Sequence, residues 1–216
     1  MKLNWAERWF VNSPFRHGLQ RLVIQWFKNT LPLKSGTNLL EIGCGRGAGA
    51  RLILESFKPH KIYLMDLDIG MIQKAKLFLS STSQRKISYC AGDATRLPFE
   101  DSCFDAVFGF GFLHHVAAWR EGLAEIARVL KPEGAYFIEE FYPSLYQNFI
   151  TKRLLAHPER DRFNSRDLHV AFTGTDLSLV HTFELKRLGI LGIGVKTEGK
   201  IFSCKEFSSS CRLSVD

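Results

Sequence analysis

Glycines at alternate positions follow an acidic residue in the first quarter of the chain. Glu41 lies at the end of an apolar run, and Gly43, Gly45 and Gly47 come directly after that run. Glycine permits a positive φ and lets the backbone approach a ligand without a Cβ in the way. The N–H groups that open the next helix can then face polar ligand atoms. This segment therefore predicts a nucleotide-type binding loop.

Two further acids follow the next apolar segments. Asp66 ends the second segment, and Asp93 comes after the third. A carboxylate after a second strand can accept hydrogen bonds from both hydroxyls of a ribose. An acceptor after the third strand can bind the amino group of an adenine. The pattern also fits a dinucleotide, because Gly43, Gly45 and Ala48 satisfy G-x-G-x-x-G/A.

The acid before the glycines separates the two cofactor classes. A carboxylate at Glu41 would repel a pyrophosphate, whereas it suits a cationic group such as the ammonium of an amino acid. This electrostatic argument favours S-adenosyl-L-methionine over NAD. Two alternatives stay open, an NAD(P)-binding Rossmann oxidoreductase and an S-adenosylmethionine-binding protein without turnover.

Alternating strands and helices must position these residues. The apolar patterns predict strands near 38–42, 61–66, 86–90, 104–110 and 135–141. They predict helices near 47–57, 70–80 and 119–130. Such alternation indicates a parallel sheet with helices on both faces, in which ligands bind at the carboxyl ends of the strands.

The two ends of the chain add helices and a strand pair. Residues 5–28 follow a helical pattern, with a break expected at Pro14. A further helix is expected to start near Ser165, whose hydroxyl can cap it. The segments 177–187 and 190–196 are typical of an antiparallel pair.

With these motifs the chain resembles the class I S-adenosylmethionine-dependent methyltransferases, in particular the small-molecule type related to the ubiquinone and menaquinone biosynthesis methyltransferases. The matching blocks are residues 40–47, 65–68, 92–99, 104–107, 113–116 and 125–134. The resemblance implies an α/β Rossmann-like three-layer sandwich, with a seven-stranded, mostly parallel sheet whose last strand is antiparallel. It also implies a helical cap at 1–36, a methyltransferase domain at 37–200 and a tail at 201–216.

The resemblance implies a set of cofactor-binding residues. Besides Glu41, those beside the methionine part and the ribose would be Gly43, Gly45, Gly47 and Phe110. Those around the ribose hydroxyls and the adenine would be Asp66, Leu67, Asp93 and Ala94.

Methyl transfer by in-line displacement needs alignment and, for many acceptors, loss of a proton. His114 can accept that proton as a neutral imidazole, and Glu140 can act as a base or bind a cationic acceptor. Alternation along a strand sends Glu139 and Glu140 to opposite faces. Structural alternatives are hydrogen bonds from the histidine to loop backbone and an ion pair between a glutamate and an arginine.

The acceptor is expected to be a small molecule. Residues 109–112 lack the Asn/Asp-Pro-Pro-Tyr/Phe block of amino-methylating DNA enzymes, so no nucleic acid partner is expected. Lids over the acceptor are expected at 141–163 and around three aromatic residues, Trp5, Trp9 and Phe10.

Composition sets the remaining expectations. The 216 residues carry a formal net charge of +7, which suits a solvated basic face, an anionic substrate or peripheral contact with a membrane. The five cysteines form no C-x-x-C pair, and no metal site is expected. No apolar run approaches the roughly 18 residues of a spanning helix, and a cytoplasmic location is the expectation.

Overall fold

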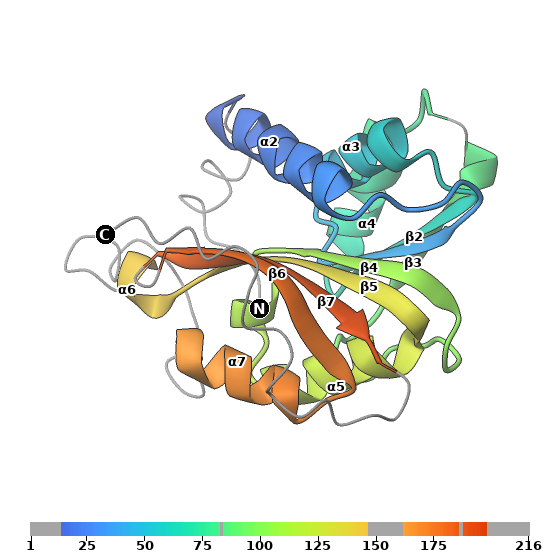
Figure 1. Cartoon of the computed structure of the whole chain (residues 1–216). Helices are drawn as coiled ribbons and strands as arrows, with labels where there is room; N and C mark the ends of the chain where they lie inside the picture. The colour runs from blue at the N-terminus through green and yellow to red at the C-terminus, as the bar shows by residue number, and fades with distance from the viewer. Residues whose placement is uncertain (1–13, 83, 147–161, 186–187, 198–216) are drawn as a thin grey trace.

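A computed structural model describes residues 14–82, 84–146, 162–185 and 188–197, which fold around one twisted sheet (Figure 1). The strands are β1 (Asn38–Ile42), β2 (Lys61–Asp66), β3 (Ile87–Ala91), β4 (Phe104–Phe110), β5 (Leu130–Phe141), β6 (Leu177–Leu185) and β7 (Gly189–Lys196). The helices are α2 (Pro14–Thr30), α3 (Ala48–Phe57), α4 (Ile69–Phe78), α5 (Trp119–Val129), α6 (Pro143–Tyr146) and α7 (Ser165–Thr173). Two short 3₁₀ helices, η1 (Gln84–Lys86) and η2 (Leu113–His115), complete the described elements.

The described sheet has seven strands in the order β3-β2-β1-β4-β5-β7-β6. Strands β1 to β5 pair in parallel, while β7 is antiparallel to both β5 and β6. The predicted mostly parallel sheet with an antiparallel last strand is therefore confirmed. The strand order reverses between β1 and β4, which is where open α/β sheets bind ligands.

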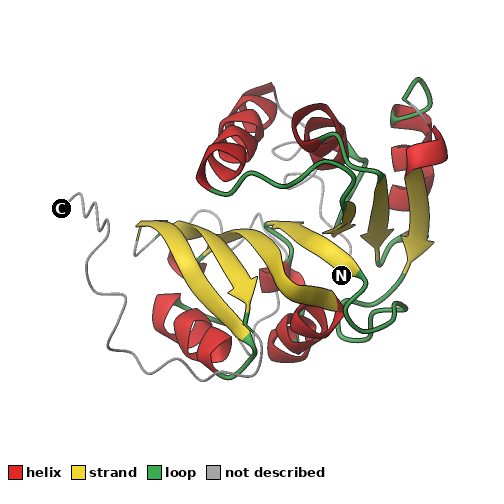
Figure 2. Cartoon of the chain, turned by 45° about the vertical axis from the view of Figure 1, so that its right-hand side comes forward, coloured by secondary structure: helices red, strands yellow, loops and turns green. Residues whose placement is uncertain are grey.

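Helices cover both faces of the sheet, as Figure 2 shows with strands in yellow and helices in red. Helices α2, α3 and α4 bury Phe27, Ile53 and Ile72 on one face. Helices α5 and α7 bury Leu123 and Leu168 on the other. Burial on both faces explains why the central strands are apolar throughout, as the sequence indicates.

Two local expectations, the start of β5 and the cap of α7, needed correction. Strand β5 begins at Leu130 rather than near 135, because Leu130 already pairs with Phe104. Asn164, not Ser165, caps α7: the Asn164 side chain accepts from the N–H of Asp167, and the Asp167 carboxylate accepts from the N–H of Asn164. Helix α2 begins at Pro14, which suits the first turn of a helix.

Several expectations concern parts of the chain that the structure does not describe or cannot test. Any helix before Pro14, the aromatic residues Trp5, Trp9 and Phe10, most of the 141–163 lid and the 201–216 tail lie outside the described residues. The boundaries at 36 and 200 stay predictions. None of the described helices combines the length and apolarity needed to cross a membrane.

Candidate active site

The loop after β1 exposes its backbone at the carboxyl edge of the sheet. Gly43, Gly45 and Gly47 adopt φ values of 69°, 52° and 88°. A Cβ added at Gly45 would meet nothing within 4 Å, whereas one at Gly43 would lie 2.6 Å from the Cβ of Phe112. Gly47 starts α3 and packs against Leu79. Gly45 is therefore the point at which a ligand can approach the backbone directly.

A carboxyl group lies buried beneath this loop. Glu41 is 2% exposed, and its Oε2 has no hydrogen-bond partner among the described residues. An added Cβ at Gly49 would overlap with its Oε1, so only glycine leaves room for the acid at that position. Burial, with a smaller contribution from Asp66, raises the pKa of Glu41 to about 8. A cationic group beside Glu41 would compensate this buried charge.

The second acid is tied to the glycine loop. Asp66 accepts hydrogen bonds from the N–H of Gly45 and the N–H of Asp68, each at 2.9 Å. Burial raises the pKa of Asp66 from its usual range. Each carboxylate oxygen keeps a further lone pair for a ligand hydroxyl. The neighbouring Leu67 is 64% exposed and offers an apolar surface at the same edge.

The third loop lies beside the second strand. The N–H of Gly92 donates to the carbonyl of Asp66 at 3.1 Å. Asp93 is exposed, and its Oδ1 accepts from the N–H and hydroxyl of Thr95, while Ala94 is buried. Because β1, β2 and β3 are neighbours, the three acids of the prediction come to one edge of the sheet.

The segment after β4 is held by a second buried acid. Glu140 Oε1 accepts from the N–H groups of Phe112 at 3.1 Å and Leu113 at 2.7 Å. Its Oε2 lies 2.6 Å from Nδ1 of His114. Burial raises the pKa of Glu140 and lowers that of His114, so the imidazole is neutral near pH 7. Glu140 thereby fixes both the backbone of η2 and the ring of His114.

Glu139 points to the opposite face, as strand alternation predicts. Its Oε2 lies 2.6 Å from Nη2 of Arg16 in α2, and both side chains are buried. Phe110, at the end of β4, packs on the same face against Phe27, with ring centroids 6.3 Å apart. The predicted structural ion pair of a glutamate with an arginine is therefore present, at Glu139.

Part of the chain is similar to known methyltransferases. Residues 40–138 match the family model described as a methyltransferase domain. The fatty-acid O-methyltransferase of Mycolicibacterium smegmatis is 34% identical over 122 residues, which cover 56% of this chain and 43% of that protein. The demethylmenaquinone methyltransferase of Mycolicibacterium gilvum is 37% identical over 99 residues, covering 42% and 40% of the two chains.

The matched residues make up a little under half of the 216 residues of the chain. The crystal structure of a SAM dependent methyltransferase from Aquifex aeolicus has the same fold, with a TM-score of 0.72 at 16% identity, and covers 91% of this chain and 100% of that one. This chain spans about two fifths of the length of the curated relatives named above.

The matched range holds all the predicted cofactor residues and His114, while Glu139, Glu140 and α2 lie outside it. Sequence reasoning did not identify Arg16. A signal was present, because Arg16 and Gln20 continue the buried stripe of Val23 and Phe27 at helical spacing. A polar residue on the buried side of a helix requires a partner.

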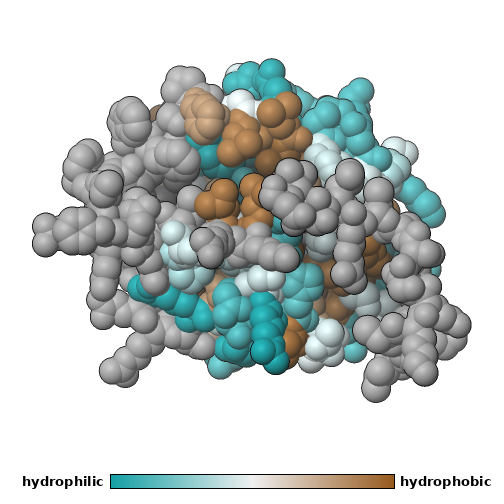
Figure 3. Space-filling model, turned by 60° about the vertical axis from the view of Figure 1, so that its left-hand side comes forward, coloured by the Kyte–Doolittle hydropathy of each residue, from teal (hydrophilic) through white to brown (hydrophobic). Residues whose placement is uncertain are grey.

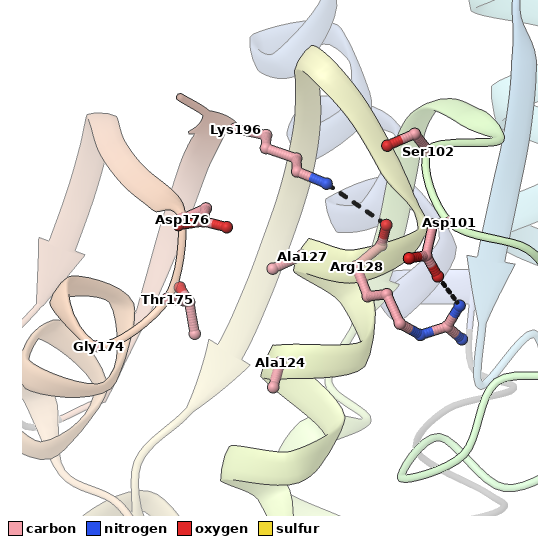
Figure 4. A pocket seen from close by; sticks show the side chains of 9 residues that line it. All are labelled: Asp101, Ser102, Ala124, Ala127, Arg128, Gly174, Thr175, Asp176 and Lys196. Carbon is pink, nitrogen blue, oxygen red and sulfur yellow. Dashed lines mark hydrogen bonds and ion pairs between the residues drawn. The ribbon is translucent and has the colours of Figure 1, made fainter. Parts of the chain in front are cut away.

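A cavity of about 370 Å³ lies at the other edge of the sheet, near the amino ends of the parallel strands (Figure 4). Lys196 crosses toward the end of α5 there and donates to the carbonyl of Leu130 at 2.7 Å. Arg128 pairs with Asp101 at 2.7 Å. None of the predicted site residues lines this cavity, and its two cations, Arg128 and Lys196, are engaged with Asp101 and with backbone carbonyls.

Proposed function

We propose that this chain transfers a methyl group from S-adenosylmethionine to a small-molecule acceptor. The observation that carries the proposal is the buried Glu41 carboxyl, whose Oε2 lacks a partner among the described residues beside an open glycine loop. A buried acid in that position suits the ammonium of an amino acid and disfavours a pyrophosphate. The methyltransferase family of residues 40–138 supports the same conclusion.

The chain's own residues account for each part of such a cofactor. Glu41 would hold the ammonium group, and the backbone at Gly45 would lie against the ligand. Asp66 would accept from the ribose hydroxyls, and Leu67 and Ala94 would flank the adenine, whose amino group Asp93 would bind. When bound, the cofactor supplies a methyl group activated by a sulfonium.

His114 is the group that we assign to the acceptor's proton. With its proton on Nδ1, the imidazole donates to Glu140 Oε2 and presents Nε2 as an acceptor. Glu140 then acts as a positioning residue, because its other oxygen is engaged with the backbone of η2. This assignment favours an acceptor that loses a proton on methylation, such as a hydroxyl.

The acceptor itself is expected to be apolar. The relatives named above are a fatty-acid O-methyltransferase and a demethylmenaquinone methyltransferase, both named for largely apolar molecules. In this chain the ring of Phe141 lies 6.1 Å from that of His114, and Phe112 is buried in the same cluster as Leu113 of η2. An apolar hydroxyl compound is therefore the substrate class that we propose.

Calorimetric titration of the full chain tests the cofactor assignment. Adenosylhomocysteine should bind, NAD should not, and Asp66→Ala should weaken adenosylhomocysteine by about tenfold or more, since two hydroxyl hydrogen bonds to a charged group are lost. Asp101→Ala, at the cavity on the other edge, is the matched control. Binding of NAD alone would exclude the proposal.

Transfer of a tritiated methyl group from labelled cofactor tests turnover. Long-chain phenols, quinols and fatty acids are the acceptors to offer first, with short polar amines as the comparison. Label that reaches only the polar amines would contradict the apolar assignment. If the chain binds adenosylhomocysteine but transfers label to none of these acceptors, the result favours an S-adenosylmethionine-binding protein without turnover.

A further inference from the structure

Helix α2 turns an apolar edge outward. Phe15, Leu19 and Leu22 are 72%, 36% and 68% exposed, although the opposite side of the same helix is buried. Their spacing of four and three residues places them along one line of the helix. Figure 3 shows hydrophobic surface near the top of the molecule, where α2 lies. A row of large exposed apolar residues is typical of an interaction surface.

Basic side chains accompany this edge. Arg21 and Lys28 are exposed on α2 and form no ion pair with a described residue, and no residue of α2 is acidic. They follow Phe15 and Leu22 by six residues each, which places them about 120° round the helix from the apolar line, on the adjoining exposed side. We call Phe15, Leu19, Leu22, Arg21 and Lys28 the α2 face.

The charge of the surrounding helix layer has the same sign. Helices α2, α3 and α4 carry six basic residues and one acid, Glu55, which pairs with Arg51 at 3.0 Å. Arg16 is buried against Glu139, which leaves four other cations in this layer. Helices α5 and α7, on the other side of the sheet, carry three basic and three acidic residues. The basic excess therefore lies on the layer that also exposes the apolar edge.

We propose that the α2 face binds the surface of an anionic lipid bilayer. An apolar stripe with cations on the adjoining exposed side, on a helix without acids, combines the two attractions that hold interfacial helices on such membranes. A nucleic acid would use the cations but not exposed Phe15 and Leu22. The inference does not depend on the proposed reaction, although α2 also borders the candidate site through Arg16 and Glu139.

Vesicle co-sedimentation of the full chain tests this proposal. The probe is vesicles of phosphatidylcholine with about one third phosphatidylglycerol, compared with phosphatidylcholine alone. Arg21→Glu with Lys28→Glu should lower the partition coefficient on the anionic vesicles by about tenfold or more, because each cation is attracted electrostatically to the anionic lipids. Phe15→Ser with Leu22→Ser should lower the partition coefficient by a similar factor. It should also reduce the vesicle binding that persists at high salt.

Matched controls lie on the opposite helix layer. Val170 is 61% exposed on α7, and Arg166 is exposed on the same helix. Val170→Ser with Arg166→Glu should leave the partition coefficient unchanged. Thermal unfolding verifies that each variant is folded. This measurement does not involve the cofactor. If the chain binds vesicles but not adenosylhomocysteine, that result contradicts the proposed function and leaves the membrane proposal in place.

Four outcomes would overturn the inference. The full chain could fail to sediment with the anionic vesicles at low salt. The two pairs of variants on the α2 face could bind as well as the control variants. Light scattering could reveal a dimer that Phe15→Ser dissociates, or a labelled oligonucleotide could bind where vesicles do not, which would assign the α2 face to another occupant.

Discussion

Two buried glutamates of the candidate site differ in how their oxygens are used. Glu140 accepts two backbone N–H groups and contacts the His114 ring, so its carboxyl group is fully engaged. Glu41 Oε2 has no partner among the described residues. A buried polar atom without a partner costs about 1–3 kcal/mol. Glu41 is therefore the residue that a cationic ligand would stabilise most.

Cofactor binding should be coupled to the proton of Glu41. Its pKa of about 8 leaves it mostly protonated at pH 7, and a bound ammonium would favour the carboxylate. Binding should then release a proton, so the affinity for adenosylhomocysteine should rise with pH up to about pH 8, by about tenfold per unit at most. Calorimetry in buffers of different ionisation enthalpy measures the release. Glu41→Gln should abolish it, and an unchanged release in that variant would exclude Glu41 as its source.

His114 should affect turnover and not cofactor binding. His114→Gln is expected to lower kcat by about 100-fold, the usual size of a lost general base, with unchanged affinity for adenosylhomocysteine. Glu140→Gln should shift the pH dependence of kcat/KM, because the imidazole loses the titratable carboxyl group in contact with Nδ1. His60→Gln, exposed before β2, is the control. An equal loss in cofactor affinity for His114→Gln would indicate a structural role.

At the scale of elements, α2 contacts both the sheet and the glycine loop. Arg16 reaches Glu139 of β5, and His17 Nε2 lies 2.9 Å from Nη2 of Arg46 in the glycine loop. Its remaining buried side chains pack on the sheet face that also carries α3. The position of α2 therefore depends on one buried ion pair as well as on apolar packing.

Removing one partner of that ion pair should be far more costly than removing a surface partner. Arg16→Ala leaves the buried Glu139 without its cation and should lower the free energy of unfolding by about 3 kcal/mol. Arg51→Ala breaks the exposed pair with Glu55 and should cost about 0.5 kcal/mol. Urea unfolding measures both. Equal costs would show that the buried pair contributes nothing beyond a surface pair.

At the scale of the whole molecule, the sheet separates two helix layers of different charge and collects the polar groups at one edge. Strand order reverses between β1 and β4, so the loops after these strands leave on opposite faces and a ligand can enter between them. The buried acids are concentrated at this edge, where they make the stability of the folded chain depend on pH.

That dependence has a defined sign between pH 6.5 and 8. Glu41 binds its proton in the folded state up to about pH 8, whereas in the unfolded chain it loses it near pH 4.5. The folded state therefore holds more protons, and the free energy of unfolding should fall as pH rises, by at most about 1.4 kcal/mol per unit from this group. His114, with its lowered pKa, acts in the opposite direction only below pH 6.5. Thermal unfolding across this range measures how the free energy of unfolding changes with pH, and Glu41→Gln should reduce that slope. An equal slope in the variant and the original chain would contradict the raised pKa of Glu41.

The sequence by itself determined the elements and the location of the candidate site. Periodicity predicted the central strands and helices. Because neighbouring parallel strands end at the same edge of the sheet, Glu41, Asp66 and Asp93 come together at the carboxyl edge. These are local properties, because the spacing of apolar residues and the positive φ of glycine do not depend on distant contacts. The same local signals left the partners of the polar residues undecided.

Only the tertiary structure decided what each buried polar group contacts. The pairing of Arg16 with Glu139 joins residues 123 positions apart, and Glu140 reaches the backbone of η2 across β4. Strand alternation separated the two glutamates but could not say which helix or loop would meet each one. Such contacts depend on how the helices pack on the sheet. The burial that results from this packing shifts the pKa values of Glu41, His114 and Glu140.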